Sequence, residues 1–247
     1  MRKLIHFPLN SDTFGHQFGI KSLDKENQIT IRTDCYKDDI SLKNELINED
    51  PDYYSVSTDR SKKSEEEASI LLINKRNNLL ETAKSLQEDL VILSGDSNLG
   101  HPIIAGVVCF PNGWAIKEKF GMSIDKVHDP VPDYAEVMSK SVNKLLTNLK
   151  PGRTFWRSNW AVRPSHRLDQ SPKMKSHVEK DQAKLNSDNV SDKCFFRLEY
   201  QTLTRLEKSG DILFTILTDQ LPIIELEKWQ QNRILILTNC KGQGKME

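Results

Sequence analysis

His128 is the histidine with the most unusual sequence context in this chain, in the segment WAIKEKFGMSIDKVHDPVPDY over residues 114–134. Pro130 and Pro132 fix their own φ angles and favour extended geometry at the residues before them, so the backbone beside His128 is stiff. A neutral imidazole on a stiff backbone is a good axial ligand for a metal. The alternative is that His128 caps or packs against the start of the next helix, and the segment alone favours this interpretation.

A second polar pattern lies in the segment FRLEYQTLTRL over residues 196–206. Side chains of a strand alternate between two faces, so Arg197, Glu199 and Gln201 share one face while Leu198 and Tyr200 point the other way. Such a polar face on a hairpin that also belongs to the core needs an explanation. The pattern therefore marks these three residues as candidates for a site.

The remaining candidates are weaker when taken one at a time. His101 is the second candidate histidine because it lies where a strand is expected to begin, whereas the other four histidines occur in polar or terminal segments and get no role. Trp156 and Trp160 share one face of another predicted strand, where core packing is the ordinary role of two tryptophans. No nucleotide-binding or zinc-protease motif is present.

Composition excludes several function classes for the chain of 247 residues. Lys plus Arg and Asp plus Glu each number 35, so no net charge attracts nucleic acid or an anionic membrane. No apolar stretch reaches the roughly 20 residues that span a bilayer, and the N-terminus does not resemble a signal peptide. The four cysteines form no CxxC pair. We expect a cytoplasmic protein with reduced thiols and no nucleic-acid or membrane partner.

The helices and strands that the sequence predicts around these residues indicate an α+β fold in a single domain. Apolar residues recur at helical spacing from Ser64 to Leu86 and from Asp133 to Leu149, which predicts two amphipathic helices. Residues 163–193 are polar and lack apolar periodicity, so we expect a polar surface loop there. Strands are predicted at 89–93, 103–110, 155–162, 194–206 and 211–218, the first two as antiparallel neighbours and the last two as a hairpin.

Five segments together resemble the haem-dependent oxidative N-demethylase family, and they occur in the order typical of that family. They are FGIKSLD near Phe18, QEDLVIL, WAIKEKFGMSIDKVH, KPGRTFWRSNW and FRLEYQTLTRLEKSGDILFTI. The resemblance divides the chain into an N-terminal extension (1–17), the family-like domain (18–220) and an atypical or truncated C-terminal segment (221–247). It implies a PAS-like antiparallel sheet covered by helices.

The resemblance also implies a chemistry. In this family, haem b and oxygen remove a methyl group from a small secondary amine such as dimethylamine, releasing the primary amine and formaldehyde. The expected partners are the alkylamine, oxygen and a separate reductase that uses NAD(P)H, flavin and a [2Fe-2S] cluster. The alternatives are a haem-binding or gas-binding sensor without turnover and a scaffold that has lost the cofactor.

Roles for the candidate residues follow from this resemblance. His128 becomes the expected axial iron ligand, with His101 as the alternative. Glu199 is expected to pair with the cationic amine, and Gln201 to bind oxygen or the strand backbone through hydrogen bonds. Trp160 is a candidate wall of the haem pocket. The haem propionates need guanidinium partners, and the candidates are Arg153, Arg157, Arg197 and Arg205.

Overall fold

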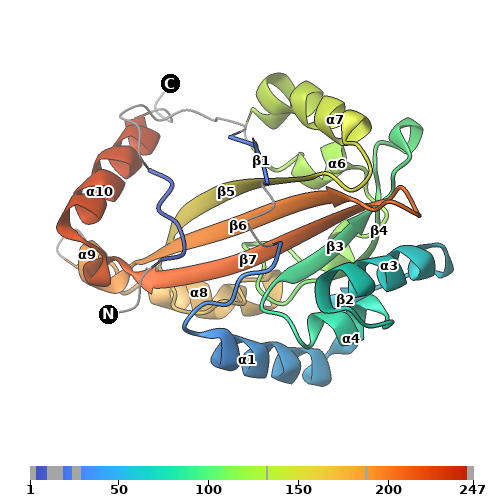
Figure 1. The fold of residues 1–247 in the computed structure, drawn as a ribbon. Helices are drawn as coiled ribbons and strands as arrows, with labels where there is room; N and C mark the ends of the chain where they lie inside the picture. Colours follow the sequence, from blue (N-terminus) through green and yellow to red (C-terminus); the bar gives the residue numbers. More distant parts are fainter. Residues whose placement is uncertain (1–3, 10–18, 24–28, 132, 187–188, 244–247) are drawn as a thin grey trace.

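One twisted antiparallel sheet with helices on both sides forms the molecule (Figure 1). The computed structural model describes residues 4–9, 19–23, 29–131, 133–186 and 189–243, with side chains up to residue 237. Phe18, Pro132 and most of the predicted N-terminal extension lie outside these residues. Within them, seven strands follow the order β1-β5-β6-β7-β3-β4-β2. This arrangement confirms the predicted α+β class.

The elements have the following bounds. The strands are β1 Lys21–Ser22, β2 Ser55–Val56, β3 Asp89–Leu93, β4 Ile103–Val107, β5 Thr154–Arg163, β6 Phe195–Arg205 and β7 Ile212–Pro222. The α-helices are α1 Tyr36–Glu49, α2 Pro51–Tyr54, α3 Lys62–Ile73, α4 Leu79–Ala83, α5 Ile116–Lys119, α6 Ile124–His128, α7 Ser139–Asn148, α8 Lys175–Gln182, α9 Val190–Lys193 and α10 Lys228–Gln243. Short 3-10 helices are η1 Asp59–Ser61, η2 Ser97–Leu99, η4 Pro172–Met174 and η5 Ile223–Glu225, and η3 Tyr134–Met138 is a π-helix.

Three long strands, β5, β6 and β7, lie side by side in the sheet, and β6 and β7 form the predicted hairpin. Strand β6 pairs with β7 from Phe195 to Arg205, and β5 pairs with the other side of β6 over its whole length. The β6–β7 turn contains Gly210, whose φ of 73° suits a residue without a side chain. Strands β3 and β4 are antiparallel neighbours, which confirms that prediction too.

Alternating residues of β3 enter hydrophobic clusters on opposite faces of the sheet. Leu90 and Ile92 pack with residues of α3 and α4, whereas Val91 and Leu93 pack with residues of α6, η3 and α7. A third cluster joins β6 to α10 and to the N-terminal residues. Figure 1 shows α6 and α7 on one side of the sheet and α3 and α4 on the other. Burial on both faces leaves polar side chains of the middle strands in the interior.

The predicted single helix from Ser64 to Leu86 is wrong, because the chain breaks it into α3 and α4. Asn74 ends α3 in the left-handed conformation with φ of 55°, which asparagine tolerates better than most residues. Asn78 then begins α4 by accepting a hydrogen bond from the backbone N–H of Glu81. The apolar positions continue in helical phase across the break, so periodicity alone did not reveal it.

The predicted helix from Asp133 to Leu149 begins with the π-helix η3 and continues as α7. Tyr134, Val142, Leu146 and Leu149 are buried as predicted, but Val137 is 56% exposed. A π-turn inserts one residue into the helix and rotates the following side chains away from the expected face. The inserted residue therefore explains why the side chain of Val137 is exposed rather than buried in the core.

The predicted loop over residues 163–193 is instead folded for much of its length. It contains η4, α8 and α9, and Ser165, Asp169, Gln170 and Ser171 are buried within it. The segment is polar, and hydrogen bonds rather than apolar packing hold its buried side chains in place. One example is the hydrogen bond from the Gln170 amide to the carbonyl oxygen of Arg167. The segment therefore covers one end of the sheet.

Candidate functional site

The register of β5 and β6 brings the predicted polar residues together on one face. Arg157 lies opposite Gln201, and Ala161 lies opposite Arg197. Since directly opposed residues share a face, Arg157, Arg197, Glu199 and Gln201 line the same side of the sheet. The alternation continues to Arg163, the last residue of β5. We call Arg157, Arg163 and Arg197 with the carboxylate of Glu199 the arginine cluster.

Arg197 anchors this cluster in the interior, where it is only 1% exposed. Its guanidinium donates hydrogen bonds to the carbonyl oxygens of Leu168 (2.9 Å) and Phe110 (2.5 Å). Its Nε lies 3.6 Å from Oε1 of Glu199. Arg197 therefore joins the folded 163–174 segment to the sheet, and most of its donors serve this structural role.

Neighbouring side chains in the sheet already stabilise the negative charge of Glu199. Its Oε2 accepts a hydrogen bond of 3.0 Å from the Gln201 amide, and its charge acts on all three guanidinium groups. Burial lowers the pKa of Arg157, Arg163 and Arg197, and the Glu199 carboxylate partly opposes this effect. Arginine stays protonated even so. Three guanidinium groups thus share the Glu199 carboxylate, and Asp89 also acts on Arg197. A concentration of guanidinium groups on one face favours a negatively charged ligand.

His128 ends helix α6, and its Nδ1 lies 2.8 Å from the carbonyl oxygen of Ile124. A carbonyl only accepts, so Nδ1 carries the proton and Nε2 keeps its lone pair in the neutral ring. Burial and the charges of Arg157 and Lys119 lower the pKa of His128, which favours this neutral form. No hydrogen bond from the described residues reaches Nε2. The ring is thus in the tautomer that binds a metal through Nε2.

Tyr134 holds the same imidazole from its face. The two rings stack with centroids 4.4 Å apart and planes 9° apart. Tyr134 opens the π-helix η3, and the preceding Asp133 has a left-handed φ of 59°. Both features are rare and concentrate at functional sites, where the surrounding structure holds them in place. The unusual backbone beside His128 therefore sets the position of the ring that stacks on it.

His101, the alternative ligand, has hydrogen-bond partners at both ring nitrogens. Its Nδ1 lies 2.9 Å from the carbonyl oxygen of Ser94, and its Nε2 lies 3.3 Å from the hydroxyl of Thr147. The residue is 1% exposed and sits in the turn before β4 with φ of 52°. These contacts join the turn to α7.

Three other candidates lie away from the arginine cluster. Trp160 points to the opposite face of β5 and stacks on Phe196, with centroids 5.8 Å apart. Arg205 donates hydrogen bonds to the carbonyl oxygens of Gly210 and Leu146, so it fastens the hairpin turn to α7. Arg153 is exposed, before the start of β5. The structure therefore brings together Arg157, Arg197, Glu199 and Gln201, with His128 near Arg157.

Arg163 belongs to the cluster but was missed by the sequence interpretation, which ended the strand at Val162. The signal was present, because the alternation of Arg157, Asn159 and Ala161 continues to Arg163. The Arg163 Nε donates a hydrogen bond of 2.6 Å to the Gln170 side chain. Asn159 is exposed between the two arginines, so solvent reaches this face.

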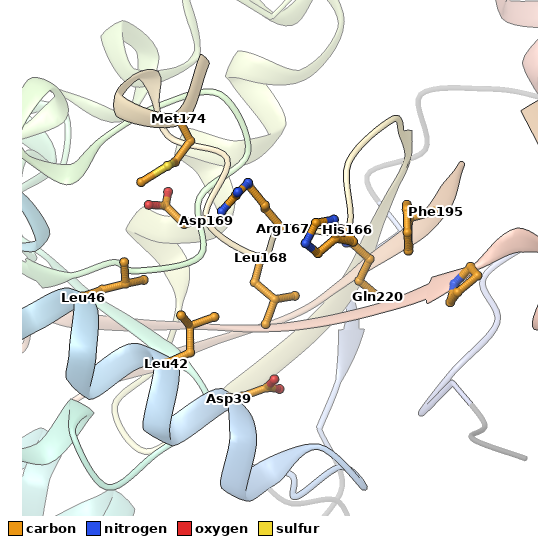
Figure 2. A pocket seen from close by; sticks show the side chains of 11 residues that line it. Asp39, Leu42, Leu46, His166, Arg167, Leu168, Asp169, Met174, Phe195 and Gln220 are labelled. Atoms are coloured by element: carbon orange, nitrogen blue, oxygen red, sulfur yellow. The ribbon is translucent and has the colours of Figure 1, made fainter. Parts of the chain in front are cut away.

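A cavity of about 490 Å³ adjoins the Arg163 end of the arginine cluster, because its lining residues Phe195 and Gln220 lie opposite Arg163 and Arg197 in the sheet (Figure 2). Its walls come from α1, from the folded segment after β5 and from the ends of β6 and β7. The lining residues are Asp39, Leu42, Leu46, His166, Arg167, Leu168, Asp169, Met174, Phe195, Gln220 and Pro222. None of these residues was singled out for a role by the sequence interpretation.

Comparison with known protein families shows to which family the chain belongs. The family model "haem-dependent oxidative N-demethylase, alpha subunit-like" matches residues 40–242. The chain belongs to this family. The match covers most of the chain and contains His128, the whole arginine cluster and α10 up to residue 242.

The described residues contain no group of three or more histidine, cysteine, aspartate or glutamate side chains arranged to hold a metal ion. In addition, none of the described helices is long and apolar enough to cross a membrane.

Proposed function

We propose that this chain binds haem b between His128 and the arginine cluster, and that it removes a methyl group oxidatively from a small secondary amine. The observation that carries the proposal is the geometry of His128. Its Nδ1 donates a hydrogen bond to the Ile124 carbonyl oxygen, so the lone pair of the neutral ring is on Nε2. The description of the family supports haem as the cofactor.

The charges of the neighbouring residues support haem as the ligand. Haem carries two propionates, and guanidinium groups bind carboxylates through paired hydrogen bonds. Arg157 and Arg163 lie on the solvent-accessible side of the cluster, beside the exposed Asn159. Arg197 is less suited to this role because its donors already bind Leu168 and Phe110. We therefore assign the propionates to Arg157 and Arg163.

When bound, haem would supply the iron that activates oxygen, and the reaction would release the primary amine and formaldehyde. The chain itself would contribute the imidazole of His128 and the guanidinium groups that fix the orientation of the cofactor. The electrons would come from a separate reductase carrying flavin and a [2Fe-2S] cluster and using NAD(P)H. We also propose that the sheet and the helices covering it form a PAS-like fold.

Absorption spectra of the haem-reconstituted protein test the site. We expect wild type to bind one haem with a histidine-type spectrum, and His128→Ala to lose or change that spectrum. The matched control is His177→Ala on the exposed side of α8, which should behave like wild type. If wild type does not bind one haem, or if the spectrum of His128→Ala is the same as that of wild type, the proposal is contradicted.

Amine turnover separates the enzyme from the two alternatives. Formaldehyde produced from dimethylamine, oxygen and an electron donor identifies an N-demethylase. Haem binding without formaldehyde identifies a sensor or gas-binding protein, and absence of haem binding identifies a scaffold.

A further inference from the structure

A carboxylate on the helix that carries His128 ties this helix to the next one. Asp125 lies three residues before His128 in α6 and is partly buried. Its Oδ1 accepts a hydrogen bond of 2.8 Å from the Ser139 hydroxyl, and each of its oxygens accepts one of 3.0 Å from the Asn143 amide. Ser139 and Asn143 are one turn apart at the start of α7. The Asp125 carboxylate therefore joins α6 to the first turn of α7.

The stacked rings of His128 and Tyr134 make a second connection between the same segments. Tyr134 is the first residue of the π-helix η3, and Ser139 follows the last one. The ring centroids are 4.4 Å apart, and the charge of Asp125 acts on both rings. The π-helix is thus attached to α6 at both of its ends, by the stack at Tyr134 and by the carboxylate at Ser139.

The attachment at Asp125 is the stronger of the two. Hydrogen bonds to an ionised carboxylate are stronger than contacts between neutral groups, and a single aromatic pair contributes little beyond the area it buries. The left-handed φ of Asp133 and the π-turn after it are costly conformations that persist only when surrounding contacts hold them. Without the carboxylate, the stack would be the weaker contact left to hold η3 against α6.

We propose that Asp125 is a positioning residue for His128, which holds η3 in place so that the Tyr134 ring fixes the plane of the imidazole. The inference rests on the proposed function in one respect, namely that His128 is the iron ligand. Groups that orient a ligand from outside raise the affinity of a metal site, because the ligand is already ordered before the metal binds. The orientation of the imidazole itself is present in the haem-free protein, where it is measured separately.

NMR spectra of the haem-free protein test the positioning without the cofactor. An aromatic ring shifts protons above its face upfield, so the carbon-bound ring protons of His128 should be shifted upfield in wild type. We expect Asp125→Ala to lose this shift. The matched control is Glu136→Ala, which removes an exposed carboxylate from η3 itself and should keep the shift. A folded Asp125→Ala protein that is less stable but keeps the upfield shift would overturn the proposal, because Asp125 would then be a structural residue alone.

A second variant keeps the test decisive if Asp125→Ala does not fold. Asn143→Leu removes the amide that donates to both oxygens of Asp125 and leaves the carboxylate in place. It should also lose the upfield shift of His128, and an unchanged shift would overturn the proposal.

Haem titration then shows whether Asp125 acts through Tyr134. Asp125→Ala should raise the Kd for haem about tenfold or more. In a Tyr134→Leu background the stacked ring is already absent, so adding Asp125→Ala should change the Kd little. Equal losses in the two backgrounds would contradict action through Tyr134. If wild type binds no haem, the proposed function fails, and the NMR shift of His128 alone decides whether Asp125 positions the ring.

Discussion

Replacing Glu199 by glutamine measures how far this carboxylate stabilises the buried arginine beside it. The change keeps the shape of the side chain and an acceptor for the Gln201 amide, so the lost quantity is the charge. With Nε of Arg197 at 3.6 Å from Oε1 of Glu199, the attraction is roughly 4–5 kcal/mol at an effective dielectric constant of about 20. The variant no longer has to desolvate its own charge, so we expect a net loss of about 3 kcal/mol in the free energy of unfolding.

Urea denaturation of the haem-free protein, followed by circular dichroism, gives this free energy directly. A loss of about 3 kcal/mol corresponds to a fall in Tm of roughly 6–12 °C for a domain of this size. Glu118→Gln is the control for removing a carboxylate from the surface. If Glu199→Gln unfolds at the same urea concentration as wild type, Glu199 does not compensate Arg197, and its charge remains available for the amine as first predicted from the sequence.

Two further predictions concern ionisable groups in the interior. Lys43→Met should destabilise the fold by about 3–5 kcal/mol in urea denaturation, because Lys43 and Asp89 are both fully buried 3.2 Å apart and the change leaves the buried Asp89 carboxylate without its cation; a loss below about 1 kcal/mol would contradict this. Glu88→Gln should raise the Tm at pH 7, because burial raises the pKa of Glu88 above its ordinary value of 4.5 and the folded state therefore disfavours the charged form. The stability gap between Glu88→Gln and wild type should shrink as the pH falls toward 4.5, where wild type also becomes protonated, and a gap that widens there would refute the reasoning.

Local patterns in the sequence were sufficient to predict the strands and the face that carries the candidate site. Alternation with period two placed Arg197, Glu199 and Gln201 on one side of β6, and the structure has them there. The turn around Gly210 identified the hairpin, because glycine adopts positive φ without strain. These features depend on neighbours in the chain, and for that reason periodicity and turn chemistry were enough.

Features that depend on distant contacts were not predicted. The hydrogen bond between His101 and Thr147 joins residues 46 positions apart, so no local signal predicted it. The π-turn at Tyr134 adds one residue to a pattern that otherwise has helical period, and only the exposure of Val137 reveals it. The folded segment after β5 is held by polar contacts such as that from Arg197 to Leu168, which apolar periodicity does not detect.

The arginines of β5 also bear on how copies of this chain avoid one another. Strand β1 pairs only with Phe155 and Trp156, so in the described part of the chain the rest of β5 has no strand on its outer side. An open strand edge is a template for pairing with another molecule and leads to aggregation unless charges interrupt it. Arg157 and Arg163 lie on this edge and repel the same edge of a second copy. The two arginines that we propose as partners of the haem propionates would therefore also protect this edge against misassembly.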